Sequence, residues 1–176
     1  MQTSAEFVIP AIENCCDKEA YAFAGLAFYW ASVLEHGALN LAVVLALPEV
    51  NVLTQNEFEA IFEDLSRKTL GQLLKTAREV IKLSARDEEI IQRALSTRNE
   101  LIHSFFRSHA EDFVSEQGRH EMKSKLSEMV LEMKEADFTI ERLYTPLWEK
   151  YGVDDAFVER QMAELRAEAE KRDGSA

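Results

Sequence analysis

The longest apolar stretch of the chain runs from residue 17 to residue 47 and predicts a single long helix. Its apolar side chains point to nearly every side of that helix: Tyr21, Phe23, Leu26, Phe28, Trp30, Val33, Leu39, Leu41, Val43 and Leu45. A helix that is apolar all round has to be covered on several sides. At about 1.5 Å per residue it would be over ~40 Å long, so we expect several helices, or a second subunit, to cover it. Pro48 is expected to end it.

Two capping boxes predict where the next two helices begin. Thr54 is followed three residues later by Glu57, and Thr69 is followed in the same way by Gln72. In this arrangement the hydroxyl and the longer side chain satisfy backbone N–H groups that the first turn of a helix leaves unpaired. We expect helices from these threonines to about residues 65 and 83.

Further capping residues predict three more helices. Ser84 is placed to cap a helix over residues 85–106, and Ser115 to cap another with apolar positions as far as Phe138. The segment 144–146, which contains Pro146, is expected to interrupt the chain. Residues 154 and 155, both aspartates, then begin a last, highly charged helix.

The absence of strand patterning decides the fold class. No stretch alternates between apolar and polar residues with the two-residue period of a strand, and the chain has only six Gly and three Pro. We therefore predict an all-α fold, a bundle of about five to six helices around one long central apolar helix. One domain is expected over residues 1–150, followed by a charged C-terminal helix or tail over residues 151–176.

We expect the protein to be cytoplasmic. Its first residues lack the basic stretch and apolar core of a signal peptide. Glu35 divides the apolar segment 20–48 into runs shorter than the ~20 residues that span a bilayer, so we interpret the segment as a core helix without membrane contact. Cys15 and Cys16 are neighbours and the only cysteines, which excludes a disulfide framework and a thiolate metal site.

Charge is distributed unevenly along the chain. The net charge is −12, but residues 67–125 carry twelve basic and nine acidic side chains, whereas both flanking segments are acidic. An acidic protein is an unusual partner for nucleic acid. The positive segment is nevertheless the one that contains the candidate chemistry described next. Ordinary variation between solvated helix faces would explain the same pattern, so RNA as a partner is neither established nor excluded by charge.

A polar cluster lies within the otherwise apolar helix predicted over residues 85–106. Asn99 and His103 are one helical turn apart and share a face, while Arg98 lies about 140° from His103 around the helix axis. Arginine offers a planar, permanently charged group that suits a phosphate, and an imidazole can exchange a proton near neutral pH. The three residues therefore suggest phosphodiester chemistry. Alternatively, Asn99 and His103 are satisfied helix polar groups and Arg98 pairs with a nearby carboxylate.

The segment around this cluster resembles a known protein family. Arg98, Asn99 and His103 match the Arg-x4–6-His element of HEPN proteins, in which a polar residue commonly follows the Arg. The resemblance extends over residues 70–122 and includes Leu70-Gly71-Gln72-Leu73, Phe105-Phe106, Glu111-Asp112-Phe113 and Gly118-Arg119. It implies a helical homodimer in which two copies of the Arg98/His103 pair face one cleft. It also implies metal-independent RNA cleavage by attack of the 2′-hydroxyl on the neighbouring phosphate, with Asn99 in support and no cofactor.

One position departs from the pattern of a HEPN subgroup. HEPN toxins that are paired with a nucleotidyltransferase antitoxin carry Tyr two residues after the His, and that Tyr is the modified residue. Phe105 stands there in this chain and has no hydroxyl, so nucleotidylation at this position is excluded. Many HEPN domains also bind without cutting, and an intact Arg/His pair does not establish activity.

Glu35 and His36 interrupt the long apolar helix and form a second candidate polar site. A lone buried charge is costly, so Glu35 should reach a partner, meet water or take up a proton. The two residues could form a polar wall beside Arg98 and His103, or only a solvent-facing notch or a hydrogen-bonded pair. We predict no zinc site, because neither His109 nor His120 forms a His/Asp/Glu cluster at ligand spacing.

Three functions follow from these patterns. The first is a homodimeric, metal-independent endoribonuclease, for example a toxin or defence effector controlled by an antitoxin or other regulatory protein. The second is a non-catalytic HEPN-like module that binds a nucleotide, RNA or a protein. The third is a helical scaffold that acts through its acidic C-terminal helix, residues 154–172.

Overall fold

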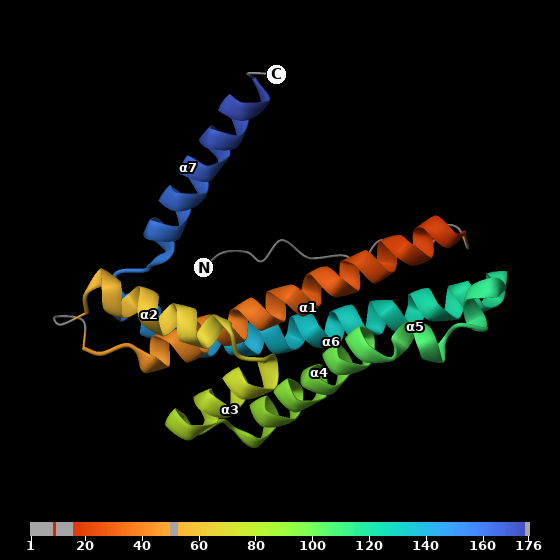
Figure 1. The fold of residues 1–176 in the computed structure, drawn as a ribbon, viewed down its shortest axis with the longest axis horizontal. Coiled ribbons are helices and arrows are strands. Elements are labelled where there is room, and N and C mark those ends of the chain that lie inside the picture. Colours follow the sequence, from red (N-terminus) through yellow and green to blue (C-terminus); the bar gives the residue numbers. More distant parts are fainter. Residues whose placement is uncertain (1–8, 10–15, 50–52, 175–176) are drawn as a thin grey trace. The chain divides into compact units, whose positions relative to one another are not determined.

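The computed structural model describes residues 9, 16–49 and 53–174, and every regular element in these ranges is helical (Figure 1). The predicted all-α class is confirmed. Six helices have eleven residues or more, and α5 is a single turn. The α-helices are α1 (Asp17–Ala46), α2 (Gln55–Ser66), α3 (Leu70–Val80), α4 (Ala85–His103), α5 (Phe105–Ser108), α6 (Glu116–Trp148) and α7 (Asp155–Asp173), with short 3-10 helices η1 (Asp112–Val114) and η2 (Glu149–Tyr151).

The predicted caps are confirmed. Thr54 and Thr69 each form a complete capping box at the start of α2 and α3. At the first of these, hydrogen bonds from the hydroxyl and the backbone N–H of Thr54 lower the pKa of Glu57 below its usual value. The hydroxyl of Ser84 accepts a hydrogen bond from the backbone N–H of Asp87 at 3.1 Å, and α4 follows. These helix starts depend on local hydrogen bonds, which explains why the sequence predicts them.

Three predicted boundaries are wrong. The helix expected to run to about residue 83 ends at Val80. The helix expected over residues 85–106 ends at His103, because Ser104 leaves the helical conformation, and Phe105 begins α5. The hydroxyl of Ser104 donates to the carbonyl of Glu100 at 3.1 Å, the kind of local bond that competes with the helix. The predicted interruption at residues 144–146 does not occur, since α6 continues through Pro146 to Trp148. A proline so close to the C-terminal end of a helix removes one ladder hydrogen bond where the ladder is about to stop.

The chain forms two compact units. Unit 1 contains residues 1–38 and 82–139, and unit 2 contains residues 39–81 and 140–176. The long helices α1 and α6 each contribute to both units. The charged C-terminal helix expected after residue 150 is α7, whereas the domain boundary predicted at that residue stays a prediction.

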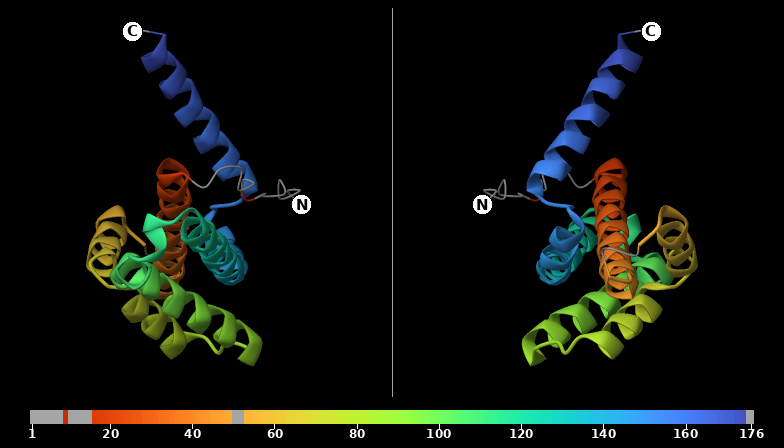
Figure 2. Two further views of the ribbon diagram at one scale, coloured as in Figure 1. Left: turned by 90° about the vertical axis from the view of Figure 1, so that its right-hand side faces the viewer. Right: turned by 90° about the vertical axis from the view of Figure 1, so that its left-hand side faces the viewer.

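Unit 1 is built on three long helical segments whose directions follow from their ion pairs. Asp17 and Glu19 of α1 pair with Arg119 and Lys123 of α6, so these two helices run in the same direction. The helix α4 runs opposite to both. Its N-terminal half reaches the middle of α6 and its C-terminal half reaches an earlier turn of α6. The end-on views in Figure 2 show α1, α4 and α6 as three separate rods, with α4 beneath the other two.

The first part of α1 is the core helix of unit 1. Alanines at four-residue and three-residue intervals face inward with almost no exposed surface, namely Ala20, Ala24, Ala27 and Ala31. Tyr21, Phe28 and Tyr29 remain 40 to 61% exposed, so part of the helix lies open. Of the helices in the described ranges, α1 is the one long and apolar enough to cross a membrane by length and composition, a test that core helices of water-soluble proteins also pass.

Unit 2 has buried apolar side chains on α3 and on the second part of α1. Leu70, Leu73, Leu74 and Ala77 of α3 are buried. The rings of Phe58 in α2 and Trp148 at the end of α6 meet edge to face at 6.4 Å. The hydroxyl of Tyr151 donates to the carbonyl of Pro48 at 2.7 Å. This bond joins η2 to the segment that follows α1.

The first prediction concerns Gly118, at the start of α6. A Cβ at this position would lie 2.5 Å from the Cα of Asp112 and closer still to its carbonyl oxygen. Because the obstacle is backbone, we expect Gly118→Ala to lower the free energy of unfolding by about 1–3 kcal/mol. Urea denaturation followed by circular dichroism at the helix band measures this change.

The matched control is Gly25→Ala in α1. A Cβ at Gly25 meets no atom within 4 Å, and an alanine inside a helix restricts the unfolded chain. We expect this substitution to raise stability by about 0.5–1 kcal/mol. Equal effects of the two substitutions would contradict the close approach at Gly118.

Candidate functional site

Arg98 points inward from α4 toward α1. Its Nη2 donates to Oε1 of Glu35, a residue 63 positions away in the chain. The side chains of Arg98 and Glu35 retain only 21% and 36% of their exposure, so solvent screens this ion pair less than it would screen a surface pair. The structure thus brings Glu35 to Arg98. This contact fits the predicted polar site, and it fits equally the alternative in which Arg98 only pairs with a nearby carboxylate.

Asn99 is the second contact of the Arg98 guanidinium. Nη1 of Arg98 donates to Oδ1 of Asn99 at 3.2 Å. Nε of Arg98 is buried and has no hydrogen-bond partner. A guanidinium has five N–H donors, and the two contacts use one on each terminal nitrogen. Arg98 therefore has donors left over while its orientation is already fixed.

His103 occupies a different side of α4. It is exposed at the last position of the helix, one turn after the exposed Asn99. Ile102 beside it is 38% exposed, which is unusual for an isoleucine. In the described ranges no hydrogen bond or ion pair joins His103 to Arg98. Within one chain, the predicted pair is therefore divided between an inward-facing arginine and an outward-facing histidine.

His36 does not join the site in this structure. Its Nδ1 donates to the carbonyl of Ser32 at 2.8 Å, one turn earlier in α1. The two residues of the predicted polar wall therefore do not act together. Glu35 contacts Arg98, whereas His36 is exposed and bonds only within α1.

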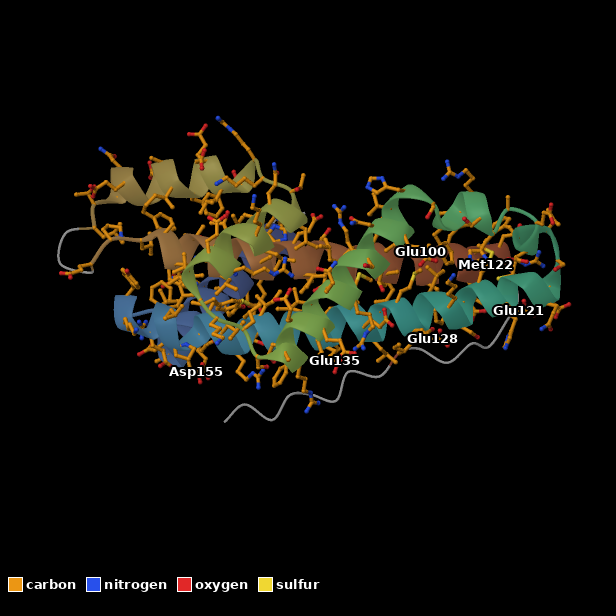
Figure 3. All side chains as sticks on the ribbon, turned by 90° about the horizontal axis from the view of Figure 1, so that it is seen from below. Glu100, Glu121, Met122, Glu128, Glu135 and Asp155 are labelled. Carbon is orange, nitrogen blue, oxygen red and sulfur yellow. The ribbon has the colours of Figure 1, made fainter. Side chains whose placement is uncertain are left out.

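A polar groove of about 230 Å³ lies along α4 and α6. Its lining includes Arg93, Thr97 and Glu100 of α4 and Lys125 and Glu128 of α6, and it does not include the Arg98 or His103 side chains. Figure 3 labels Glu100 and Glu128 on the two helices. Most of the charges in the groove are paired across it, since Nε of Arg93 lies 3.8 Å from Oε1 of Glu132 and Nζ of Lys125 lies 2.8 Å from Oε1 of Glu100. The groove therefore works as a polar seam between the two helices.

The structure reveals a chain of titratable groups that the sequence did not indicate. Nδ1 of His109 lies 2.6 Å from Oδ2 of Asp112, and Nε2 of His109 lies 3.4 Å from Nζ of Lys125, which also meets Glu100. The signal in the sequence was the three-residue spacing of His109 and Asp112, but Lys125 and Glu100 come from other helices. In the described ranges, no group of three or more His, Cys, Asp or Glu side chains could hold a metal ion.

A second ion pair that the sequence did not indicate contains a fully buried lysine. Lys123 of α6 has no exposed side-chain surface and pairs with Glu19 of α1, whose side chain is 18% exposed. A buried lysine requires such a partner, because an isolated ammonium in an apolar environment is strongly unfavourable. Its place in the sequence, three and seven residues before the buried Leu126 and Val130, could have suggested an inward position, but not the identity of its partner.

Phe105, the residue at the modified tyrosine position of the toxin subgroup, belongs to the core of unit 1. It has no exposed surface, and its ring lies 4.6 Å from the His109 ring and 5.4 Å from the Phe106 ring. Phe105 therefore fills an enclosed position in that core.

No protein-family model matches the chain, and neither the curated proteins nor the solved structures show a significant similarity to it. The site is consequently interpreted from its own geometry.

The second prediction concerns the coupling between Arg98 and Glu35. Because the pair is half-buried and joins two helices, a double-mutant cycle with Arg98→Gln and Glu35→Gln should give a coupling energy of about 1–3 kcal/mol. Urea denaturation of the four proteins measures it.

Arg67 and Glu63 provide the matched pair. They form an ion pair within α2, where their side chains are 73% and 69% exposed. The same substitutions there should give a coupling energy below about 0.5 kcal/mol. If the two cycles gave the same coupling, the Arg98–Glu35 pair would not be an anchor of the site.

Proposed function

We propose that this protein is a metal-independent endoribonuclease of the HEPN type that acts as a homodimer, with Arg98 and His103 as its active pair. A role as a toxin or defence effector, held in check by an antitoxin or another regulatory protein, fits such an activity. The proposal rests on the residues of the Arg-x4-His element and on how the fold presents them.

The observation that carries the proposal is the anchoring of Arg98. A glutamate from another helix and the neighbouring Asn99 hold its guanidinium, while donors remain for a further acceptor. Electrostatic stabilisation of a transition state is most effective when the donors are fixed before the reaction. A guanidinium that served only as a surface charge would need no such support.

The division of the pair between two sides of α4 supports a site made by two copies. His103 and Asn99 lie exposed on one turn, with the exposed Ile102 beside them. A second copy that covered this turn would bury Ile102. It would also gather two copies of His103 and Asn99 in one cleft, where each Asn99 is hydrogen-bonded to its own Arg98.

Cleavage then requires only proton transfer and charge stabilisation. The 2′-oxygen of a ribose forms a bond to the adjacent phosphorus as it loses its proton, and the bond to the 5′-oxygen breaks as that oxygen gains one. In the proposed mechanism His103 moves one of these protons, and Arg98 stabilises the negative charge that builds on the phosphate oxygens. The products are a 2′,3′-cyclic phosphate and a 5′-hydroxyl.

One observation favours a second function. Glu35 already neutralises much of the charge of Arg98, which weakens its attraction for a phosphate. A non-catalytic HEPN-like module that binds a nucleotide, RNA or a protein partner would tolerate this. Such a module requires the Arg98 face for binding and does not require His103 for chemistry.

The third prediction separates the two functions. Purified protein incubated with mixed RNA in the presence of EDTA should generate ends with 2′,3′-cyclic phosphate. Arg98→Ala and His103→Ala should each reduce the cleavage rate by about 100-fold or more, because each removes a group that acts in the transition state. Gel analysis of end-labelled RNA and chemical mapping of the ends measure both results.

Arg67→Ala and His120→Ala are the matched controls. Both positions lie outside the Arg-x4-His element, and these variants should cut at the wild-type rate. Equal activity of His103→Ala and wild type would exclude the nuclease mechanism. Absence of cleavage by a folded dimer, combined with RNA binding that depends on Arg98, would establish the binding module instead.

A further inference from the structure

The C-terminal helix α7 leaves an apolar stripe uncovered. None of its residues is buried, and Phe157, Val158, Met162 and Leu165 are 37 to 59% exposed. Val158, Met162, Leu165 and Ala169 follow the alternating four-residue and three-residue spacing of a coiled-coil seam. At about 100° per residue they fall within an arc of about 60°. An exposed stripe of this kind requires a covering surface.

We propose that α7 pairs with α7 of a second copy of this chain in an antiparallel two-helix coiled coil. A second copy is the expected partner, because the apolar positions of the stripe face one another when two such helices run in opposite directions. When Met162 faces Leu165 of the partner subunit, Val158 faces Ala169 of the partner subunit, and the twofold axis generates the same contacts in reverse. The centre of the pair is therefore apolar throughout.

The charges beside the stripe decide the orientation. In the same register, Asp155 at the start of α7 lies opposite Arg172 of the partner subunit at its end. Glu159 lies beside Arg166 of the partner subunit on one flank of the seam. Each of these pairs occurs twice and joins opposite charges, as the flanking positions of coiled coils do when they select a partner.

A parallel pairing in register would bring like charges together. Asp154 would approach Glu159 of the partner subunit, and Glu168 would approach Asp173 of the partner subunit. Asp155 and Arg172 would each meet their own copies across the seam. These repulsions disfavour the parallel form. The apolar contacts and the flanking charge pairs are both compatible with the antiparallel form.

Such a contact is separate from the face around His103. It does not rest on the proposed nuclease activity, and it would hold two copies together whatever their activity. Tethering through α7 would raise the effective concentration of one copy near the other and so favour any second contact between them. A helix pair of 19 residues is short, so we expect weak dimerisation, with a dissociation constant on the order of micromolar.

The fourth prediction tests the stripe. In sedimentation equilibrium of the full chain, Met162→Glu and Leu165→Glu should each raise the dissociation constant of the dimer about tenfold or more, because a charge would enter the seam. The matched controls, Ala163→Glu and Ala167→Glu, add the same charge on the opposite face of α7 and should leave the constant unchanged. Since no α7 residue is buried, the thermal unfolding of all four variants should match that of wild type.

The orientation has its own test. Glu159→Arg and Arg166→Glu should each weaken the dimer, and the double variant should restore it to within about threefold of wild type, because opposite charges face one another again. A parallel pair would be strengthened by Glu159→Arg, since the new cation would face Asp154 of the partner subunit, and that result would overturn the antiparallel arrangement.

Two further outcomes would overturn the proposal as a whole. One is a wild-type chain that remains monomeric at concentrations of about 1 mM, well above the expected constant. The other is a dimer whose dissociation constant is unaffected by both stripe variants, as expected if the face around His103 alone holds the copies together. The RNA cleavage assay is read separately, so the failure of either proposal is distinguishable from that of the other.

Discussion

The organisation of unit 1 depends on two partly buried carboxylates of the apolar helix α1. Partial removal from water makes an unpaired carboxylate unfavourable, so each one is stabilised by a cation from another helix. Glu19 of α1 meets Lys123 of α6, and Glu35 of α1 meets Arg98 of α4. Apolar packing alone tolerates small slides of one helix along another, whereas paired charges fix the register. The parallel run of α1 and α6, and the reversed run of α4, are thereby specified.

This constraint also shapes the candidate site. Because Glu35 draws Arg98 toward α1, the arginine is anchored on the inner side of α4 while His103 remains on the outer side. Glu35 therefore joins α1 to α4 and also sets the orientation of the guanidinium. Under the proposed function, stability and chemistry would be coupled at this one residue.

The two surfaces proposed for self-association differ in character. The face around His103 is a mixture of polar groups and isolated apolar side chains on a rigid helix, suited to hold a substrate between two copies. The stripe on α7 is a regular seam with charged flanks, suited to select a partner and an orientation. A weak seam and a weak face strengthen one another when both join the same two molecules, since the second contact forms without further loss of translational freedom.

The sequence by itself determined the features that depend on neighbouring residues. The capping boxes at Thr54 and Thr69, the all-α class and the polar cluster on one helix all follow from spacings of three or four residues. The effect of Pro146 was misjudged, because its cost depends on how near the helix already is to its end. Only the tertiary structure decided which residues pair across helices, for example Lys123 with Glu19. The sequence cannot identify such partners, because packing brings together charges that are far apart along the chain.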